Sequence, residues 1–297
     1  MSQGESTGGL VLFHQVHLPV LLIPVGPFYI GWVLAAQTLL PVDWTFYLGL
    51  LSILPFLGIG TVLLNDAFDV KVDSLSRRKG EFASSRGDID RRTLVIIAVV
   101  SLLISLAMAL LLSPEFALVM GLLILFTLLY SVPPVQLSRR PGLDLLANML
   151  GIGVLCTIAG WVLASPGSLP PTVWLITSAL GTGTFFLLPT LMDYESDREG
   201  GKATVAVALG WAGACALGTV LISMADVGIV YMSLSSIILK PAFLWIAWPI
   251  ILGEVVIFPV LARRRDLRKV LTGAMGGLLF IGNLVIVLSY LDLLGPF

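Results

Sequence analysis

Charged side chains are scarce in this 297-residue chain, because Asp, Glu, Lys and Arg together make up only 12% of it. A soluble domain carries about 25%. So little charge cannot cover the surface of a water-soluble globule, which argues against a soluble enzyme, a disordered chain and a nucleic-acid-binding protein. Hydrophobic residues reach 57% and the mean hydropathy is +1.00. The composition therefore indicates a protein embedded in a lipid bilayer.

Cysteine and histidine are nearly absent, with two of each. Cys156 and Cys215 lie inside apolar runs, so they form neither a disulfide framework nor a metal cluster, and we expect them to be small buried hydrophobic residues. The segment before the first apolar run contains no basic residue and no small-residue cleavage site. We therefore expect no removable signal peptide.

Long apolar runs predict the architecture. A membrane-spanning helix needs ~20 mostly apolar residues, and nine such runs occur. They predict an all-α, multi-pass membrane protein that forms a single domain over residues 1–297. A further apolar segment, 228–239, is too short to span separately and is expected to extend the seventh helix or to lie in the interface. The nine expected spans are residues 17–40, 44–70, 94–112, 116–132, 145–164, 173–192, 205–224, 241–262 and 270–291.

The positions of Lys and Arg orient these helices. With nine spans, 16 of the 17 basic residues fall in four loops on one side of the membrane, and Lys240 alone lies on the other. Because positive loops stay in the cytoplasm, we expect a cytoplasmic N-terminus and an external C-terminus in the cell membrane. The four basic loops are residues 71–92, 139–140, 198–202 and 263–269.

The end of the second predicted helix carries an unusual polar face. At ~100° per residue, Asn65, Asp66, Asp69 and Asp73 fall within one quadrant of the helix surface. Like charges at this spacing repel each other and destabilise a helix. Acidic residues at membrane depth are rare and usually functional, so this face is a candidate site.

A second acidic cluster ends the sixth predicted helix. Asp193 and Asp197 lie one turn apart on one face, whereas Glu195 points nearly the opposite way. If these acids were only solvated residues at helix ends, single acids would be explained. The occurrence of two clusters with their acids on one helix face would not. A divalent cation would relieve the repulsion, and sites with oxygen ligands alone suit Mg²⁺, which takes its other ligands from water and substrate phosphates.

The two acidic motifs end the second and the sixth predicted helix, four helices apart, so both helices run in the same direction. This spacing suggests a duplicated four-helix unit, about 17–132 and 145–262, followed by a ninth helix at 270–291. The acidic ends of such units could face each other across a central cavity.

Basic residues follow each cluster and would complete a diphosphate site, although membrane topology alone explains any one of them equally well. A diphosphate at a membrane-buried cavity implies an ester with an apolar tail, and a polyprenyl diphosphate fits that description. The candidate diphosphate ligands are Arg77, Arg78, Lys79 and Arg86 after the first cluster, and Arg198 and Lys202 after the second.

Four segments resemble the UbiA superfamily of intramembrane prenyltransferases. NDAFDVKVD at 65–73 is similar to the NDxxDxxxD motif of that family, and DYESD at 193–197 is similar to its second DxxxD motif. YSVPP at 130–134 and KATVAV at 202–207 resemble two further family segments. The chain departs from the family pattern after YSVPP, where the basic pair at 139–140 is displaced by a residue or more.

The resemblance implies a bundle of nine helices around a central cavity with cytoplasmic cap loops. It further implies Mg²⁺-dependent transfer of a polyprenyl group from an isoprenyl diphosphate, such as geranylgeranyl diphosphate, to an aromatic ring or lipid. The partners would be that diphosphate, a hydrophobic acceptor and membrane lipid, with no nucleic acid, and Mn²⁺ is expected to substitute for Mg²⁺. The implied metal ligands are Asn65, Asp66, Asp69 and Asp73 for one ion and Asp193 and Asp197 for a second.

Three other polar residues lie in the predicted helices. Tyr130 would stabilise a carbocation or bind the diphosphate, or else it is an interfacial tyrosine. Asn148 would orient substrate or bond between helices. Glu254 has no partner that the sequence reveals, and an interhelical or protonated role is favoured over that of an acceptor base.

Two other functions stay open. An ion- or proton-coupled transporter also places acids inside a helix bundle, although these acids cluster at helix ends. A lipid phosphotransferase of the CDP-alcohol type also uses acids on a membrane helix, but its DGxxAR segment is absent from this chain. No residue distinguishes between acceptors or fixes the prenyl chain length.

Overall fold

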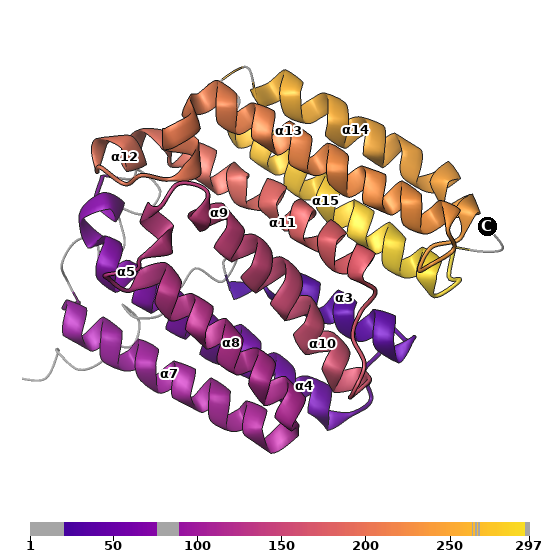
Figure 1. The fold of residues 1–297 in the computed structure, drawn as a ribbon, viewed down its shortest axis with the longest axis horizontal. Helices are drawn as coiled ribbons and strands as arrows, with labels where there is room; N and C mark the ends of the chain where they lie inside the picture. The colour runs from indigo at the N-terminus through magenta and orange to yellow at the C-terminus, as the bar shows by residue number, and fades with distance from the viewer. Residues whose placement is uncertain (1–20, 76–88, 263, 265, 267, 295–297) are drawn as a thin grey trace, which may run out of the picture.

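The computed structural model describes residues 21–75, 89–262, 264, 266 and 268–294. Every regular element in these ranges is a helix, and the helices lie side by side in one bundle (Figure 1). Within these ranges eight helices are long and apolar enough to cross a bilayer, and a shorter apolar helix, Val25–Ala36, precedes them. The prediction of an all-α, multi-pass membrane protein is therefore confirmed.

The helices follow the predicted order. The expected first span is described only from its later part, as helix α3, because residues 1–20 lie outside the described ranges. In chain order the elements are α3 (Val25–Ala36), α4 (Trp44–Leu51), η1 (Ser52–Leu57), α5 (Gly58–Asp73), α7 (Arg91–Leu112), α8 (Pro114–Ser131), η2 (Leu137–Arg139), α9 (Leu143–Asn148), η3 (Met149–Cys156), α10 (Thr157–Ala164), α11 (Thr172–Met192), α12 (Tyr194–Glu199), α13 (Val205–Leu234), η4 (Pro241–Phe243), α14 (Leu244–Ala262) and α15 (Arg268–Tyr290).

Two of the spans contain a wider, π-helical section. The second span runs continuously through α4, η1 and α5, and η1 contains Pro55, which has no N–H to donate to a helical ladder. The fifth span runs through α9, η3 and α10 in the same way. Both spans are nevertheless continuous helices that are long enough to cross a bilayer.

Local sequence signals set the starts of α7 and α8. Asp90 caps α7 by accepting a hydrogen bond from the backbone N–H of Thr93. Ser113 caps α8 by accepting from Phe116, and Pro114 occupies the first turn, where its missing N–H is not needed. Ser113 is thus the single residue between α7, which ends at Leu112, and α8.

Two boundaries differ from the predicted ones. Helix α13 continues to Leu234, so most of the apolar segment 228–239 extends the seventh span, which was one of its two expected places. The DYESD motif does not continue the sixth helix: α11 ends at Met192, the backbone leaves helical geometry at Asp193 (ψ 7°), and α12 is a separate short helix. The residues after Met192 are mostly polar and do not continue the apolar span. The chain turns there and forms the separate helix α12.

The packing brings the ends of α5 and α12 together. Helix α12 contacts α5, α11 and α13, and both α5 and α12 lie at the same end of the bundle (Figure 1). The C-terminal end of α15 lies at the opposite end. Residues separated by more than a hundred positions thus meet at one end of the bundle.

Candidate active site

The acidic face of α5 is buried. Asp66, Asp69 and Asp73 are at most 5% exposed, and Asn65 beside them is half-buried. Carboxylates are rarely buried unless charged or polar groups compensate them. The one-face arrangement expected from the helical spacing therefore points into the protein rather than toward lipid or water.

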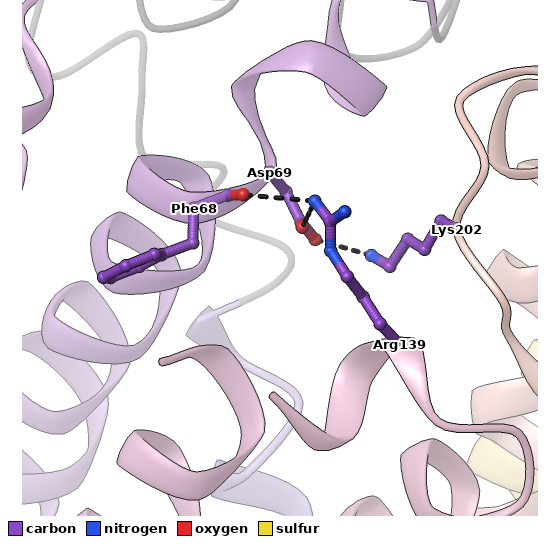
Figure 2. Close-up of polar contacts among 4 residues, drawn as sticks. All are labelled: Phe68, Asp69, Arg139 and Lys202. Carbon is purple, nitrogen blue, oxygen red and sulfur yellow. Dashed lines mark hydrogen bonds and ion pairs between the residues drawn. The ribbon is translucent and has the colours of Figure 1, made fainter. Parts of the chain in front are cut away.

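Two cations hold Asp69 at the centre of this face (Figure 2). Arg139 donates from Nη2 to Oδ1 of Asp69 at 2.9 Å and to the carbonyl of Phe68 at 3.2 Å. Lys202 donates from Nζ to Oδ2 of Asp69 at 2.6 Å. Three segments far apart in the sequence therefore meet at one carboxylate: the end of α5, the short helix η2 and the turn before α13.

Lys202 is held in its charged form. Its burial disfavours the ammonium group, but the Asp69 carboxylate raises the pKa of Lys202 above its ordinary value, with further contributions from Tyr130 and Asp197. Its backbone N–H also donates to the carbonyl of Asp197 at 2.8 Å, which fixes the turn. A lysine that stays charged while buried can neutralise an anionic substrate.

The acidic residues of the second motif differ in solvent exposure. Asp197 is buried at 7% exposure, Asp193 is half-buried, and Glu195 is exposed. The Asp197 N–H donates to the carbonyl of Asp193 at 2.9 Å, so one turn connects the two residues despite the helix break. Asp193 and Asp197 thus lie nearer the interior than Glu195, as their helical phase predicts.

Tyr130 and Asn148 join the site from α8 and α9. The Asn148 side chain donates to the carbonyl of Asp144 at 2.9 Å and lies close to the Tyr130 hydroxyl. The charges of Lys202, Asp69 and Asp144 all act on that hydroxyl. Tyr130 is therefore part of the polar end of the bundle rather than a tyrosine facing the lipid interface.

The sequence analysis missed two residues that shape the site. Asp144 is fully buried and accepts from the backbone N–H groups of Gly142 and Val205, both at 2.8 Å, so it ties the start of α9 to the start of α13. Arg139 was recognised only as a topological charge. The available signals were an acid at the start of an apolar run and a basic pair soon after YSVPP.

The other predicted diphosphate ligands divide into two groups. Arg198 is exposed on α12, outside the buried network around Asp69. The four basic residues predicted after the first cluster, Arg77, Arg78, Lys79 and Arg86, lie outside the described residues.

The donor atoms fit a hard divalent cation, although they do not converge on one point. No group of three or more His, Cys, Asp or Glu side chains within the described ranges lies close enough to hold a metal. Asp66 and Asp73 are seven residues apart, which is ~10 Å along a helix. Both oxygens of Asp69 already bind cations. An ion here would therefore bind one or two carboxylates and take other ligands from water or phosphate, as Mg²⁺ does.

A cavity of about 770 Å³ opens between α3, α11, α13, α14 and α15. Its wall is mostly apolar, and it reaches inward to Ile152 and Phe185. Ile152 lies one helical turn beyond Asn148, which contacts Tyr130. Apolar space thus begins close to the polar end of the bundle and continues into the membrane region.

Comparison with known proteins identifies relatives of this architecture. Residues 25–271 match the UbiA prenyltransferase family. A lycopene elongase/hydratase from Haloferax volcanii is 33% identical over 223 residues, which cover 70% of this chain and 69% of that protein. A lycopene elongase/hydratase from Haloarcula japonica is 34% identical over 160 residues, which cover 50% of this chain and about half of the relative, 49%.

Solved structures show the same fold. A UbiA homolog from Archaeoglobus fulgidus, bound to GPP and Mg²⁺, superposes with a TM-score of 0.72 over 93% of this chain and 99% of that chain, at 20% identity. A digeranylgeranylglyceryl phosphate synthase superposes with a TM-score of 0.70 at 15% identity, over 95% of this chain and 98% of that one. At such identities the likeness establishes the fold alone.

Proposed function

Because this chain belongs to the UbiA prenyltransferase family, we propose that it transfers a prenyl group from an isoprenyl diphosphate to an apolar acceptor inside the membrane, releasing diphosphate. The family confirms the enzyme class predicted from the sequence. The observation that best supports the specific reaction is the buried Asp69, bound by Arg139 and Lys202 at the end of the bundle where the two acidic helix ends meet.

The polar end of the bundle suits the diphosphate. Arg139 and Lys202 are held in place by Asp69, and both are cations of the kind that binds phosphate oxygens. A bound diphosphate would compete with Asp69 for Arg139 and Lys202. Both side chains would then donate some of their hydrogen bonds to the leaving group. Lys202 contributes most in this role because its side chain is only 12% exposed, whereas that of Arg139 is 33% exposed.

The acidic helix ends would supply the metal ligands. Asp66, Asp69 and Asp73 on α5, with Asp193 and Asp197 beside α12, would hold Mg²⁺, which neutralises charge on the diphosphate as the allylic C–O bond breaks. Solved relatives bind GPP or DMAPP together with Mg²⁺, which supports this proposal.

The remaining residues position the organic part of the substrates. Tyr130, whose hydroxyl is influenced by Lys202 and Asp69, would stabilise the positive charge that develops on the prenyl carbon. The apolar wall excludes water from that carbon and accommodates an acceptor. The names of the curated relatives favour a long isoprenoid hydrocarbon of the lycopene type as acceptor.

Product analysis tests the proposed reaction. We expect purified protein in lipid nanodiscs to convert a labelled isoprenyl diphosphate and lycopene into a prenylated product with release of diphosphate, and we expect EDTA to stop the conversion. A transporter would instead move ions across a liposome membrane and release no diphosphate. Diphosphate released without any prenylated product would contradict the proposed acceptor class.

We also propose that the polar end of the bundle faces the cytoplasm. Glu199 follows the second acidic motif, whereas Glu115 lies at the turn that begins α8, and both side chains are exposed. With Cys156 and Cys215 replaced by Ala, an impermeant thiol reagent should label Glu115→Cys in intact cells. It should label Glu199→Cys only after permeabilisation, and the reverse pattern would overturn the proposed orientation.

A further inference from the structure

Arg139 and Lys202 lie on two separate turns, each before a helix. Arg139 ends η2, which precedes α9, and Lys202 lies three residues before Val205, the start of α13. Both side chains nevertheless reach the same carboxylate, that of Asp69 (Figure 2). If a diphosphate takes over part of their hydrogen bonding, Asp69 alone cannot keep the two cations together. Another contact has to hold the two turns at a fixed separation.

One buried carboxylate joins these turns. Oδ1 of Asp144 accepts from the N–H of Gly142 and Oδ2 accepts from the N–H of Val205, both at 2.8 Å. Gly142 has a φ of 83°, in the left-handed region that favours glycine, and the N–H of Asp144 donates to the carbonyl of Arg140 at 3.1 Å. Asp144 therefore fixes the turn after Arg139 with one oxygen and the start of α13 with the other.

The start of α13 passes this position on to Lys202. The N–H of Thr204 donates to the carbonyl of Lys202 at 3.1 Å, and the N–H of Lys202 donates to the carbonyl of Asp197 at 2.8 Å. These bonds restrict the backbone between Lys202 and Val205. A shift of Val205 away from α9 would therefore move Lys202 with it, away from Arg139.

Helix capping alone does not account for Asp144. Helix α13 already has a cap, because the hydroxyl of Thr204 accepts from the N–H of Val207 at 3.4 Å. The bond from Val205 to Asp144 instead crosses to another helix, 61 positions away in the sequence. A carboxylate suits this link, since an amide of the same size has one acceptor oxygen and would turn an N–H₂ donor toward the second N–H.

Asp144 holds the backbone, whereas Arg139 keeps a donor for a ligand. Asp144 is 0% exposed, and both of its oxygens accept backbone N–H groups. The Nε of Arg139 is buried and has no partner among the described residues. A buried donor without a partner is costly unless a ligand completes it. The guanidinium is therefore the group that contacts the ligand, and Asp144 acts through its effect on position.

We propose that Asp144 is a positioning residue for the diphosphate. By holding the starts of α9 and α13 together, it sets Arg139 and Lys202 at the separation that lets both bind one leaving group. This inference rests on the proposed function and deepens it by naming what holds the phosphate-binding cations in place.

Binding of inorganic diphosphate with Mg²⁺ tests this role without the acceptor or the reaction. The protein in nanodiscs is titrated by calorimetry, and thermal unfolding is recorded for each variant. We expect Asp144→Asn to weaken diphosphate binding about tenfold, because one backbone N–H loses its acceptor and the two turns move apart.

A double-mutant cycle with Lys202→Met shows whether Asp144 acts through the lysine. Without Lys202 there is no pair of cations to space, so Asp144→Asn should weaken binding by less than about twofold further. A purely structural role would give the same tenfold loss in both backgrounds. Asp144→Ser cannot reach Val205 and places no amide against a backbone N–H, so it keeps the test decisive if Asp144→Asn does not fold.

Thr204→Val is the matched control. It removes a buried side-chain cap from the same helix start but leaves the bond between Asp144 and Val205 in place. Diphosphate affinity should stay within about twofold of the unaltered protein, even if thermal unfolding shifts as much as in Asp144→Asn.

An unchanged diphosphate affinity in Asp144→Asn would overturn the inference, and so would an equal loss in the Lys202→Met background or in Thr204→Val. Unaltered protein that binds no diphosphate would overturn it too. Prenyl transfer is measured in the same preparation. Coupled binding without transfer contradicts only the proposed reaction, and transfer without the coupling contradicts only the role of Asp144.

Discussion

Asp69→Asn should lower the rate of prenyl transfer at least ~1,000-fold, which corresponds to about 4 kcal/mol of transition-state stabilisation. The amide keeps the size of the side chain but loses the charge that holds Lys202 and Arg139. Removing one partner of a buried ion pair also leaves the other charge uncompensated, which lowers the stability of the folded protein by ~3–5 kcal/mol. Single-turnover rates in nanodiscs measure the effect, with thermal unfolding as a check on folding.

The matched control lies in the second acidic motif. Glu195 has the same charge as its neighbours Asp193 and Asp197, but it is exposed while Asp197 is buried. Glu195→Gln should therefore retain activity within about threefold, a difference of under 1 kcal/mol. Asp197→Asn should lose most of it. If Glu195→Gln were as inactive as Asp69→Asn while remaining folded, the acids would act through general charge at the membrane surface and the proposed metal face would be wrong.

Hydropathy and helical spacing determine much of this structure. The spans follow from runs of apolar residues, and the buried face of α5 follows from the positions of its aspartates. Both features depend on local sequence, so a single chain suffices to predict them. The exposure of Glu195 follows from local spacing as well, even though α12 is a separate helix.

The tertiary contacts could not be read in this way. Arg139 reaches Asp69 because the short helix η2 turns it back toward α5, and no local pattern specifies that turn. Glu254 was recognised as an acid in a membrane helix, but the neighbouring acid Asp226 lies 28 positions earlier on another helix. Such pairs depend on how helices rotate and cross, which their own periodicity leaves open.

Gly160→Ala should destabilise the protein by about 3 kcal/mol or more, because it overpacks a contact between two helix backbones. A Cβ atom at Gly160 on α10 would lie 1.8 Å from the carbonyl oxygen of Phe28 on α3. The contact is reciprocal, since a Cβ at Gly31 would lie 2.1 Å from the carbonyl oxygen of Thr157. Backbone atoms cannot move aside as a side-chain end does, so α3 and α10 would have to separate.

Gly121→Ala on α8 is the control, because a Cβ there would meet nothing within 4 Å. It should leave the midpoint of thermal unfolding unchanged or raise it slightly, since alanine favours helix over glycine by up to ~1 kcal/mol. Helix α3 forms one wall of the cavity through Gly26, Pro27 and Ile30. Separating α3 from α10 should therefore weaken acceptor binding in any Gly160→Ala protein that still folds. A Gly160→Ala protein as stable as Gly121→Ala would show that α3 packs less closely on α10 than the structure indicates.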